Sequence, residues 1–335
     1  MNLKPLRVLD RTAIASSLLI ACAQLGHAAV AEWKPEKNIE IIVAATPGGG
    51  YDNLARPIQR VLQERKLVDP PVVLVHKPGA GGAIGWGYLN QRPNDGHTVS
   101  IISGTILGAN IMGRSAQKYT EFTTLPMMFN EYVGFHVKAD SPIKDGRDLV
   151  ERYKKDPLAL SMTGGTSVGT LTHVAFALVL KKAGFQHDMR KLKVVAFNST
   201  GEAAVAAAGG HIDVVATRPS NVIELVKSGK LRTLAVSAPQ RISAIPQVPT
   251  WKELGIDAVY GNWFGMIGPA AMTPAQIAYW DDVLLRLTRS EDWKKELEKN
   301  LWSNMYMPSR QSRQFLDQQN EELRVLMTDI GLAKQ

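Results

Sequence analysis

The chain carries the run Thr46-Pro47-Gly48-Gly49-Gly50-Tyr51-Asp52 and, further on, the run Lys77-Pro78-Gly79-Ala80-Gly81-Gly82. Each glycine-rich turn follows an apolar, strand-like stretch, at residues 41–45 and 72–76, and precedes a plausible helix start. Glycine permits a positive φ and a close approach of bare backbone N–H groups to a ligand. A helix that begins there adds unpaired N–H donors and a partial positive charge, which favour an anion. We therefore expect the two turns to hold an anion rather than to transform it.

Spacing argues against two nucleotide-binding motifs. The first turn is not a P-loop, because no Gly-Lys-Ser/Thr follows it. The second approaches the dinucleotide fingerprint, but Ile84 stands in place of the third glycine, and Asp95 lies in a turn before a strand. Asp52 is expected to cap a helix, and Pro57 to kink that helix or mark its true start. The alternative that the glycines serve only as tight turns stays open.

The first 31 residues are predicted to be an export signal. Lys4, Arg7 and Arg11 precede an uncharged core at residues 12–25, and Ala29-Val30-Ala31 offers a small-x-small cleavage site. A competing reading is a lipoprotein tether through Cys22, since Leu19-Ile20-Ala21-Cys22 resembles a lipobox; a retained signal anchor is the third. All three readings place the folded part outside the cytoplasm, and we expect the periplasm.

Length and charge bound the function further. Cleavage after Ala31 leaves 335 − 31 = 304 residues, enough for two α/β lobes, with a net charge of (39 − 3) − (31 − 1) = +6. The basic residues are dispersed, which does not indicate nucleic acid. The only cysteine is Cys22, so the mature chain would have no disulfide, and the seven histidines lack metal-ligand spacing. We expect neither metal nor cofactor, and a monomer.

Strand-like and helix-like segments alternate from residue 41 to about residue 237, which indicates an α/β protein with mostly parallel sheets flanked by helices. An isolated strand at residues 263–267 then precedes a run predicted to be helical to the end. Such helices make a poor third domain and are better placed back on the first lobe. The prediction is therefore lobe 1 at residues 32–136 plus 263–335 and lobe 2 at residues 137–262. Two hinge crossings follow, near residues 133–137 and 263–267.

A third turn offers the sharpest enzyme hypothesis. Gly165-Thr166-Ser167-Val168-Gly169 matches the nucleophile elbow of α/β-hydrolases between a strand and a helix. Its partners are poor, because the relay would have to use Asp188 and His211 within the same half-lobe, and no histidine follows residue 211. A serine hydrolase therefore remains the least favoured alternative, and we expect no enzyme. Ser167 and Thr166 are better interpreted as hydroxyl donors or helix caps.

A fourth turn, Asn198-Ser199-Thr200-Gly201, also lies between a strand and a helix and is crowded with small polar donors. In open α/β sheets ligands bind beyond the carboxyl ends of the strands, so four such turns would face one another across a cleft. Arg218 follows a strand at the same end and could pair with a second carboxylate; a solvent-facing arginine is the simpler alternative.

At this point the chain resembles the substrate-binding proteins of the tripartite tricarboxylate transporters, the Bug-type receptors. The resemblance rests on Pro47–Asp52 with Ala55-Arg56, and on Lys77–Gly85. It continues through Pro93-x-Asp95-Gly96, Gly209-Gly210-x-Ile212-Asp213 and Lys227–Val236, then through Pro246-x-Val248-Pro249-Thr250, Glu253-x-Gly255 and Trp263-Phe264-Gly265. It covers essentially all of the mature chain, with the motifs in order.

The resemblance implies a type II-like two-lobed periplasmic fold that closes on a small carboxylate, such as a di- or tricarboxylate or an aromatic acid, and delivers it to a membrane permease. A sensor of the same fold that signals to a membrane kinase is the alternative. Thr46-Pro47 replaces the Phe-Pro of many members, and many have an amide or aromatic residue near Arg218, so ligand identity does not transfer. The predicted binding residues are Thr46, Pro47, Gly48, Gly49, Gly50, Tyr51, Pro78, Gly79, Ala80, Gly81, Ser103, Thr105, Gly165, Thr166, Ser167, Asn198, Ser199, Thr200 and Arg218.

Overall fold

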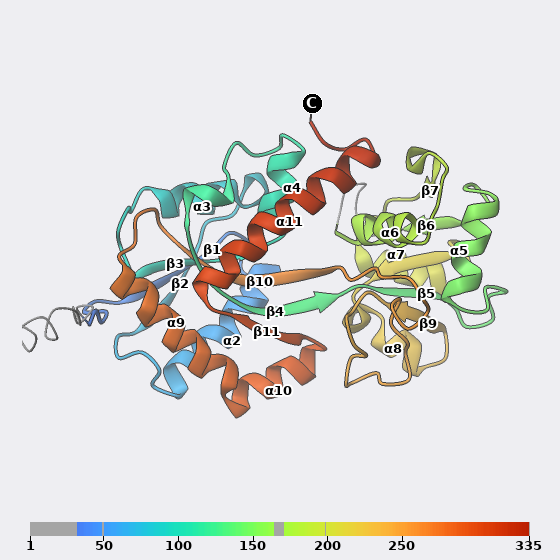
Figure 1. The fold of residues 1–335 in the computed structure, drawn as a ribbon. Coiled ribbons are helices and arrows are strands. Elements are labelled where there is room, and N and C mark those ends of the chain that lie inside the picture. Colours follow the sequence, from blue (N-terminus) through green and yellow to red (C-terminus); the bar gives the residue numbers. More distant parts are fainter. Residues whose placement is uncertain (1–31, 49, 164–170, 198, 335) are drawn as a thin grey trace, which may run out of the picture.

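The computed structural model describes residues 32–48, 50–163, 171–197 and 199–334, and these form two α/β lobes (Figure 1). Within this part of the chain, lobe 1 is built on a six-stranded sheet of order β11-β4-β10-β3-β1-β2, and lobe 2 on a five-stranded sheet of order β7-β6-β8-β5-β9. The strands of lobe 1 are β1 (Ile39–Val43), β2 (Val72–His76), β3 (Thr98–Ser103), β4 (Thr123–Tyr132), β10 (Gly261–Gly268) and β11 (Ser303–Met307). Those of lobe 2 are β5 (Gly134–Lys138), β6 (Ser161–Thr163), β7 (Lys193–Val194), β8 (Val214–Thr217) and β9 (Leu231–Val236).

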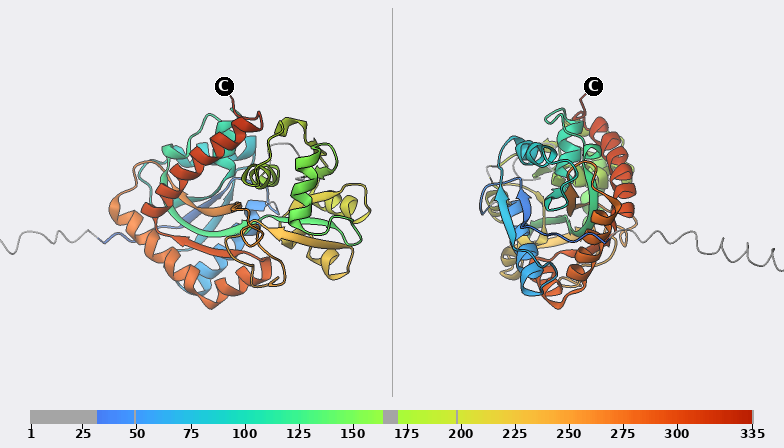
Figure 2. Two further views of the ribbon diagram at one scale, coloured as in Figure 1. Left: turned by 45° about the vertical axis from the view of Figure 1, so that its right-hand side comes forward. Right: turned by 90° about the vertical axis from the view of Figure 1, so that its left-hand side faces the viewer.

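Helices cover both faces of the lobe 1 sheet (Figure 2). One face packs against α2 (Gly50–Glu64), α9 (Pro274–Arg289) and α10 (Glu291–Asn300) in a core rich in aromatic rings. The other face packs against α3 (Ala83–Asn90), α4 (Thr105–Ile111) and α11 (Ser309–Asp329). The short 3-10 turns η1 (Ala80–Gly82) and η2 (Tyr119–Glu121) lie in the connections. Because helices cover both faces, β3 is buried at every residue, and its Thr and Ser side chains are buried along with its Val and Ile side chains.

Lobe 2 has the same layered plan. Its sheet is covered on one face by α5 (Gly146–Lys155) and α6 (Leu171–Lys182), and on the other by α7 (Thr200–Ala208) and α8 (Ile223–Lys227). Two 3-10 turns, η3 (Met189–Lys191) and η4 (Pro219–Asn221), complete the lobe. Helix α6 is apolar nearly all round because it is shared: Phe176 packs in lobe 2, whereas Val174 and Ala177 join the core of lobe 1 against α11.

The chain changes sheet twice, at Val133 between β4 and β5 and again just before Gly261 at the start of β10. Both sheets are therefore mixed. β1, β2 and β3 are mutually parallel, as are β6, β7 and β8, while the crossing strands β10 and β5 run antiparallel to β3 and β8. The proposed lobe boundaries at 136/137 and 262/263 fall inside β5 and β10 and stay a prediction.

This topology brings the carboxyl ends of both parallel sets to the junction between the lobes. Ser103, the last residue of β3, lies opposite Phe264 near the start of β10, where the chain has just returned to lobe 1. Thr217, the last residue of β8, lies opposite Gly134, where β5 has just entered lobe 2. We call the carboxyl ends of the two parallel sets, β1–β3 and β6–β8, with the turns that follow them, the junction edge.

Some local features differ from the expectations. The C-terminal region is not purely helical, because β11 adds an antiparallel strand to the edge of the lobe 1 sheet; its residues, Ser-Asn-Met-Tyr-Met, give no clear strand pattern. Helix α4 was not predicted. Pro57 lies inside α2 and does not start it.

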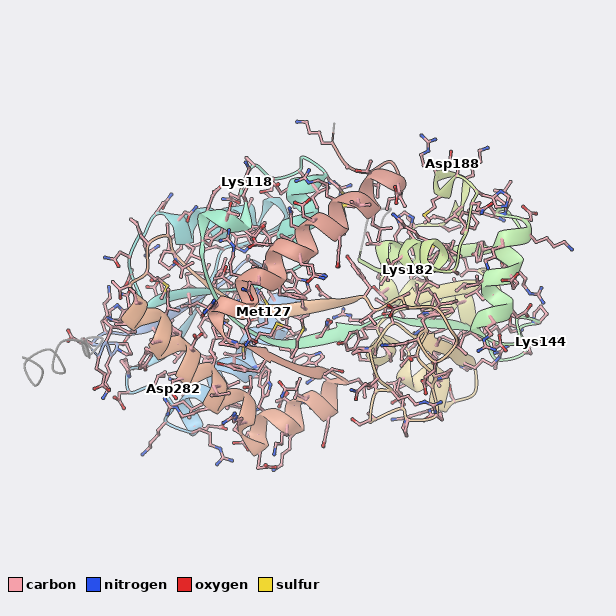
Figure 3. The ribbon with its side chains drawn as sticks, in the orientation of Figure 1. Lys118, Met127, Lys144, Lys182, Asp188 and Asp282 are labelled. Atoms are coloured by element: carbon pink, nitrogen blue, oxygen red, sulfur yellow. The ribbon has the colours of Figure 1, made fainter. Side chains whose placement is uncertain are left out.

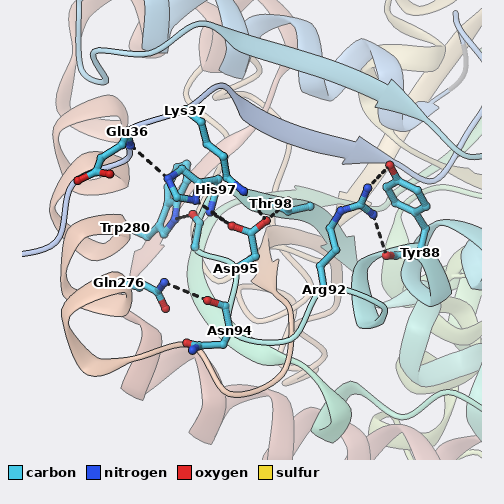
Figure 4. Close-up of polar contacts among 11 residues, drawn as sticks. Glu36, Lys37, Tyr88, Arg92, Asn94, Asp95, His97, Thr98, Gln276 and Trp280 are labelled. Carbon is cyan, nitrogen blue, oxygen red and sulfur yellow. Dashed lines mark hydrogen bonds and ion pairs between the residues drawn. The ribbon is translucent and has the colours of Figure 1, made fainter.

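The predicted turn at residues 93–96 lies at the opposite end of β3, away from the junction edge (Figure 4). The Asp95 carboxylate accepts hydrogen bonds from His97 Nδ1 (2.8 Å) and Thr98 Oγ1 (3.1 Å), and Trp280 Nε1 donates to the Gly96 carbonyl (2.9 Å). Burial pushes the pKa of Asp95 up, but the hydrogen bonds from His97 and Thr98 outweigh it and lower the pKa. Asp95 thus stabilises a turn and is not placed to bind a nucleotide ribose.

Candidate ligand site at the junction edge

A buried carboxylate fixes the first glycine-rich turn. The side chain of Asp52 is 0% exposed and accepts hydrogen bonds from Gly48 N (2.7 Å), Arg56 Nε (2.8 Å) and His76 Nε2 (2.7 Å). Burial alone would raise the pKa of Asp52, but the hydrogen bonds from Gly48, His76 and Arg56 outweigh it and lower the pKa to about 2. Asp52 lies within the first turn of α2 and is not its cap. The hydrogen bond from the Gly48 N–H to Asp52 therefore fixes the glycine-rich turn that precedes the helix.

Three predicted residues form a hydroxyl cluster beside this turn. Tyr51 Oη and Ser103 Oγ are 2.6 Å apart, and Ser103 Oγ donates to Thr105 Oγ1 at 3.0 Å. Burial raises the pKa of the Tyr51 hydroxyl, against the opposite effect of its hydrogen bonds to Ser103 and Thr105, so the group stays neutral. The ring of Tyr51 meets Phe264 edge to face at 6.4 Å. Thr105 is exposed, which leaves the end of the cluster accessible.

The second glycine-rich turn presents backbone donors. Gly79 has φ 124° and Ala80 has φ 48°, both in the left-handed region. A φ of 124° is strained for any residue with a Cβ, so the turn favours glycine at Gly79. Within the described residues, no group accepts a hydrogen bond from the N–H of Gly79 or Ala80. Pro78, Gly79 and Ala80 are exposed, so these N–H groups can bind an anion.

For the other predicted residues of the first turn, the structure gives exposure and secondary structure. Thr46, Pro47 and Gly48 are exposed and Gly50 begins α2, while Gly49 lies outside the described residues. The N-terminus of the fifteen-residue α2 is thus directed to the junction edge, where its partial positive charge favours an anion.

In lobe 2, the described binding candidates are Ser199, Thr200 and Arg218. Ser199 caps α7, because its side chain accepts a hydrogen bond from Glu202 N at 3.1 Å, and Thr200 is the first residue of the helix. The predicted residues Gly165, Thr166, Ser167 and Asn198 lie outside the described residues.

Arg218 does not simply face solvent, because it forms an ion pair with Glu131. Its Nη1 donates to both carboxylate oxygens of Glu131, at 3.0 and 2.8 Å, and thereby joins lobe 2 to lobe 1. The Glu131 side chain is 5% exposed and that of Arg218 is 41% exposed. Trp302 Nε1 donates to Glu131 Oε1 at 2.7 Å. The one strong cation predicted for the site is thus already paired with a buried acid.

Two residues of the hydrolase alternative are described, whereas Ser167 lies outside the described residues. Asp188 and His211 precede β7 and β8, which are parallel to β6, so both lie at the amino-terminal edge of the sheet. Asp188 pairs with Arg190 (2.8 Å) on the outer surface of lobe 2, as Figure 3 shows for Asp188. The acid of the relay is thus engaged in a surface ion pair.

Among the described residues, no group of three or more His, Cys, Asp or Glu side chains is arranged to hold a metal ion. Described residues line a pocket of about 460 Å³ beside Trp302 and Arg241, one of about 520 Å³ between α6 and α11, and one of about 610 Å³ beside Asn53 and Arg56 of α2. None of the described helices is long and apolar enough to cross a bilayer.

Sequence reasoning missed the residues that support the site. Arg56 stands four residues after Asp52, the spacing of a helical ion pair, and His76 ends the strand before the second turn. Glu131 was also missed, although a lone acid in the apolar run of residues 125–135 indicates a buried, paired charge. Its partner could not be read from sequence, because Trp302 and Arg218 come from other elements.

The sequence of this chain is similar to those of known proteins. The family described as "Tripartite tricarboxylate transporter family receptor" matches residues 54–332. The chain belongs to this family. A Cupriavidus necator protein, "UPF0065 protein in gbd 5'region", is 27% identical over 327 residues, covering 95% of this chain and 97% of the relative. The protein BugT of Bordetella pertussis is 28% identical over 263 residues, covering 77% of this chain and 78% of its own.

Solved structures agree with the receptor fold. A TctC solute binding protein from Polaromonas has a TM-score of 0.78 at 25% identity, covering 88% of this chain and 99% of that chain. MatC from Rhodopseudomonas palustris, solved with bound malate, has a TM-score of 0.66 at 20% identity. An R. palustris protein solved with adipate has a TM-score of 0.71 at 19% identity. The two-lobed fold of a periplasmic binding protein, predicted from the sequence, is confirmed.

Proposed function

We propose that this receptor captures a small carboxylate between its lobes and delivers it to the membrane permease of a tripartite tricarboxylate-type transporter. The observation that carries the proposal is the pair of backbone N–H groups at Gly79 and Ala80, which have no acceptor within the described residues and lie on the junction edge. Bare amides oriented by a turn are donors suited to a carboxylate. The neutral hydroxyls of Tyr51, Ser103 and Thr105 form a cluster at the end of β3, and helix α4, which begins at Thr105, contacts η1 of the second turn.

The charge arrangement supports reversible binding. Asp52 is paired with Arg56 and His76, and Glu131 with Arg218, so the junction edge holds the ligand mainly with neutral donors. Burying an anion against neutral donors and water avoids the desolvation cost of a fixed ion pair and permits release. The malate and adipate of the two R. palustris structures are small carboxylates, which agrees with the proposed class.

The two crossings supply the motion that capture needs. Rotation about Val133 and the residues before Gly261 would bring the lobe 2 turns against the first-lobe turns and bury the ligand. The permease then selects the closed form. In this account residues 1–31 direct export to the periplasm, and the receptor acts as a monomer without cofactor or catalysis.

A thermal-shift screen tests the proposal. A ligand that binds only the folded receptor must raise its melting temperature. We expect a rise with at least one member of a panel of mono-, di-, tri- and aromatic carboxylates. No shift with any carboxylate, together with a shift from amino acids or sugars, would contradict the proposed substrate class.

A further inference from the structure

Glu131 lies on the same sheet face as the hydroxyl cluster. Ser103 lies opposite Phe264, and Phe264 opposite Phe129, so the three side chains form one row across β3, β10 and β4. Glu131 follows Phe129 by two residues, which places it on that face and one step nearer to lobe 2. The ring of Trp302 stacks on Phe129 at 4.4 Å, on the same face. Two strand spacings, about 10 Å, separate β3 from β4.

This separation has the scale of a small ligand with its contacts. A carboxylate held near Ser103 and the second turn would direct its other end towards lobe 2, where Arg218 follows β8 at the junction edge. The Arg218–Glu131 pair thus stands at the far end of the proposed site. The far end of a bound ligand would therefore meet both the positive charge of Arg218 and the negative charge of Glu131.

The geometry makes Glu131 the fixed member. It is 5% exposed and anchored by Trp302 Nε1, whereas Arg218 is 41% exposed. Drawing Arg218 away towards a ligand would leave a buried carboxylate with a single neutral donor, which is costly. A second ligand carboxylate that reached Arg218 in place would lie close to the Glu131 carboxylate, and like charges in contact disfavour binding.

We propose that Glu131 is a specificity-determining residue that neutralises Arg218 and so disfavours a second carboxylate at that end of the site. The preferred ligand then carries one carboxylate and an uncharged far end. The proposal rests on the proposed function and narrows its substrate class. It concerns the charge of the ligand and not its overall size.

Matched ligand pairs test this charge rule. Butyrate with succinate, and hexanoate with adipate, differ at one end only, and calorimetry is run on the pair at the chain length with the larger thermal shift. We expect the wild-type receptor to bind the monocarboxylate more tightly. Glu131→Gln keeps the shape and an acceptor for Trp302, and should shift the affinity ratio towards the dicarboxylate by about tenfold or more.

The outcomes separate the two proposals. A wild type that prefers the dicarboxylate, or an unchanged ratio in Glu131→Gln, overturns the role of Glu131 while leaving carboxylate capture intact. Absence of binding by every carboxylate tested overturns the proposed function itself. Should Glu131→Gln fail to fold, Arg218→Gln asks the same question: it leaves Glu131 negative and should weaken the dicarboxylate further relative to the monocarboxylate. An unchanged ratio there also overturns the proposal.

Discussion

In lobe 1 the turn before α2 is held by the ionised and fully buried carboxylate of Asp52, whereas in lobe 2 the start of α7 is held by the neutral hydroxyl of Ser199. One buried titratable group of lobe 2 is His136 on β5, which bonds Thr233 Oγ1 at 2.9 Å and whose pKa burial lowers to about 4. The difference teaches that a charged and buried network orders the turn in lobe 1, whereas a neutral cap begins the helix in lobe 2. Under the proposed function, the rigid turn of lobe 1 would hold the anion first, and lobe 2 would add its contacts on closure.

The largest effect should come from removing the carboxylate in lobe 1. Asp52→Ala leaves Gly48 N and His76 without their acceptor and loses a charge whose pKa is held at about 2. A pKa lowered from 3.8 to about 2 corresponds to about 2 kcal/mol, and the lost packing adds to it, so we expect a loss of about 3 kcal/mol. Urea unfolding at pH 7 measures it.

Arg56→Ala is the matched control, because it removes only an exposed partner of Asp52 and should cost less than about 1 kcal/mol. Equal losses in Asp52→Ala and Arg56→Ala would mean that the buried carboxylate does not hold the turn. The same buried group predicts a second property: its stabilisation is present above pH 3.8 and is lost as the pH falls through about 2.

A smaller effect is expected in lobe 2, in the way that the free energy of unfolding depends on pH. Burial lowers the pKa of His136 to about 4 from 6.5, against a weaker raising effect of its bond to the Thr217 carbonyl. The unfolded chain therefore takes up a proton that the folded chain refuses, so stability is full above pH 6.5 and declines towards pH 4. Between pH 7.5 and pH 5 we expect this residue to account for a loss of about 2 kcal/mol.

His136→Gln supplies the comparison, since it retains a hydrogen-bonding side chain but cannot titrate. Between pH 7.5 and pH 5, the free energy of urea unfolding should fall by about 2 kcal/mol more in the wild type than in this variant. A pH dependence that is identical in the two proteins would contradict the assignment to His136.

The smallest effect should come from the cap of α7. Ser199→Ala removes the acceptor for Glu202 N and should lower the free energy of unfolding by about 1 kcal/mol. Ser199→Asn caps equally well and should preserve it. If chemical denaturation gave Ser199→Ala a loss as large as that of Asp52→Ala, the contrast between the lobes would disappear.

Much of this architecture was predictable, and the failures have physical causes. β2 occupies the predicted residues 72–76, because a valine-rich run followed by Lys77-Pro78-Gly79 is a local signal for a strand. β11 was missed because an edge strand such as residues 303–307 is stabilised by its neighbour β4 and not by its own pattern. The α6 helix shared between lobes could be predicted as a helix, but not as an interlobe contact.

The candidate site also contains residues that the sequence could indicate and residues that it could not. The turns and the hydroxyls of Tyr51, Ser103 and Thr105 were predicted, because strand ends and glycines are local signals. The partner of Arg218 was not, because Glu131 lies 87 residues away on the other lobe. Ion pairs between distant elements are decided by the tertiary fold. Four predicted residues in lobe 2 and Gly49 lie outside the described residues, and the binding role of the whole set stays a prediction.

The central claim, that the second glycine-rich turn binds a carboxylate through its backbone donors, is tested most directly at Ala80. This exposed residue has φ 48°, a conformation that both Asn and Asp tolerate better than Ala, so the two variants should fold alike and differ only in charge. The measurement is calorimetric titration with the carboxylate that gives the largest thermal shift. We predict that Ala80→Asn retains affinity within a few-fold, whereas Ala80→Asp loses binding by at least about a hundredfold through like-charge repulsion. Equal affinity in the two variants would contradict the account.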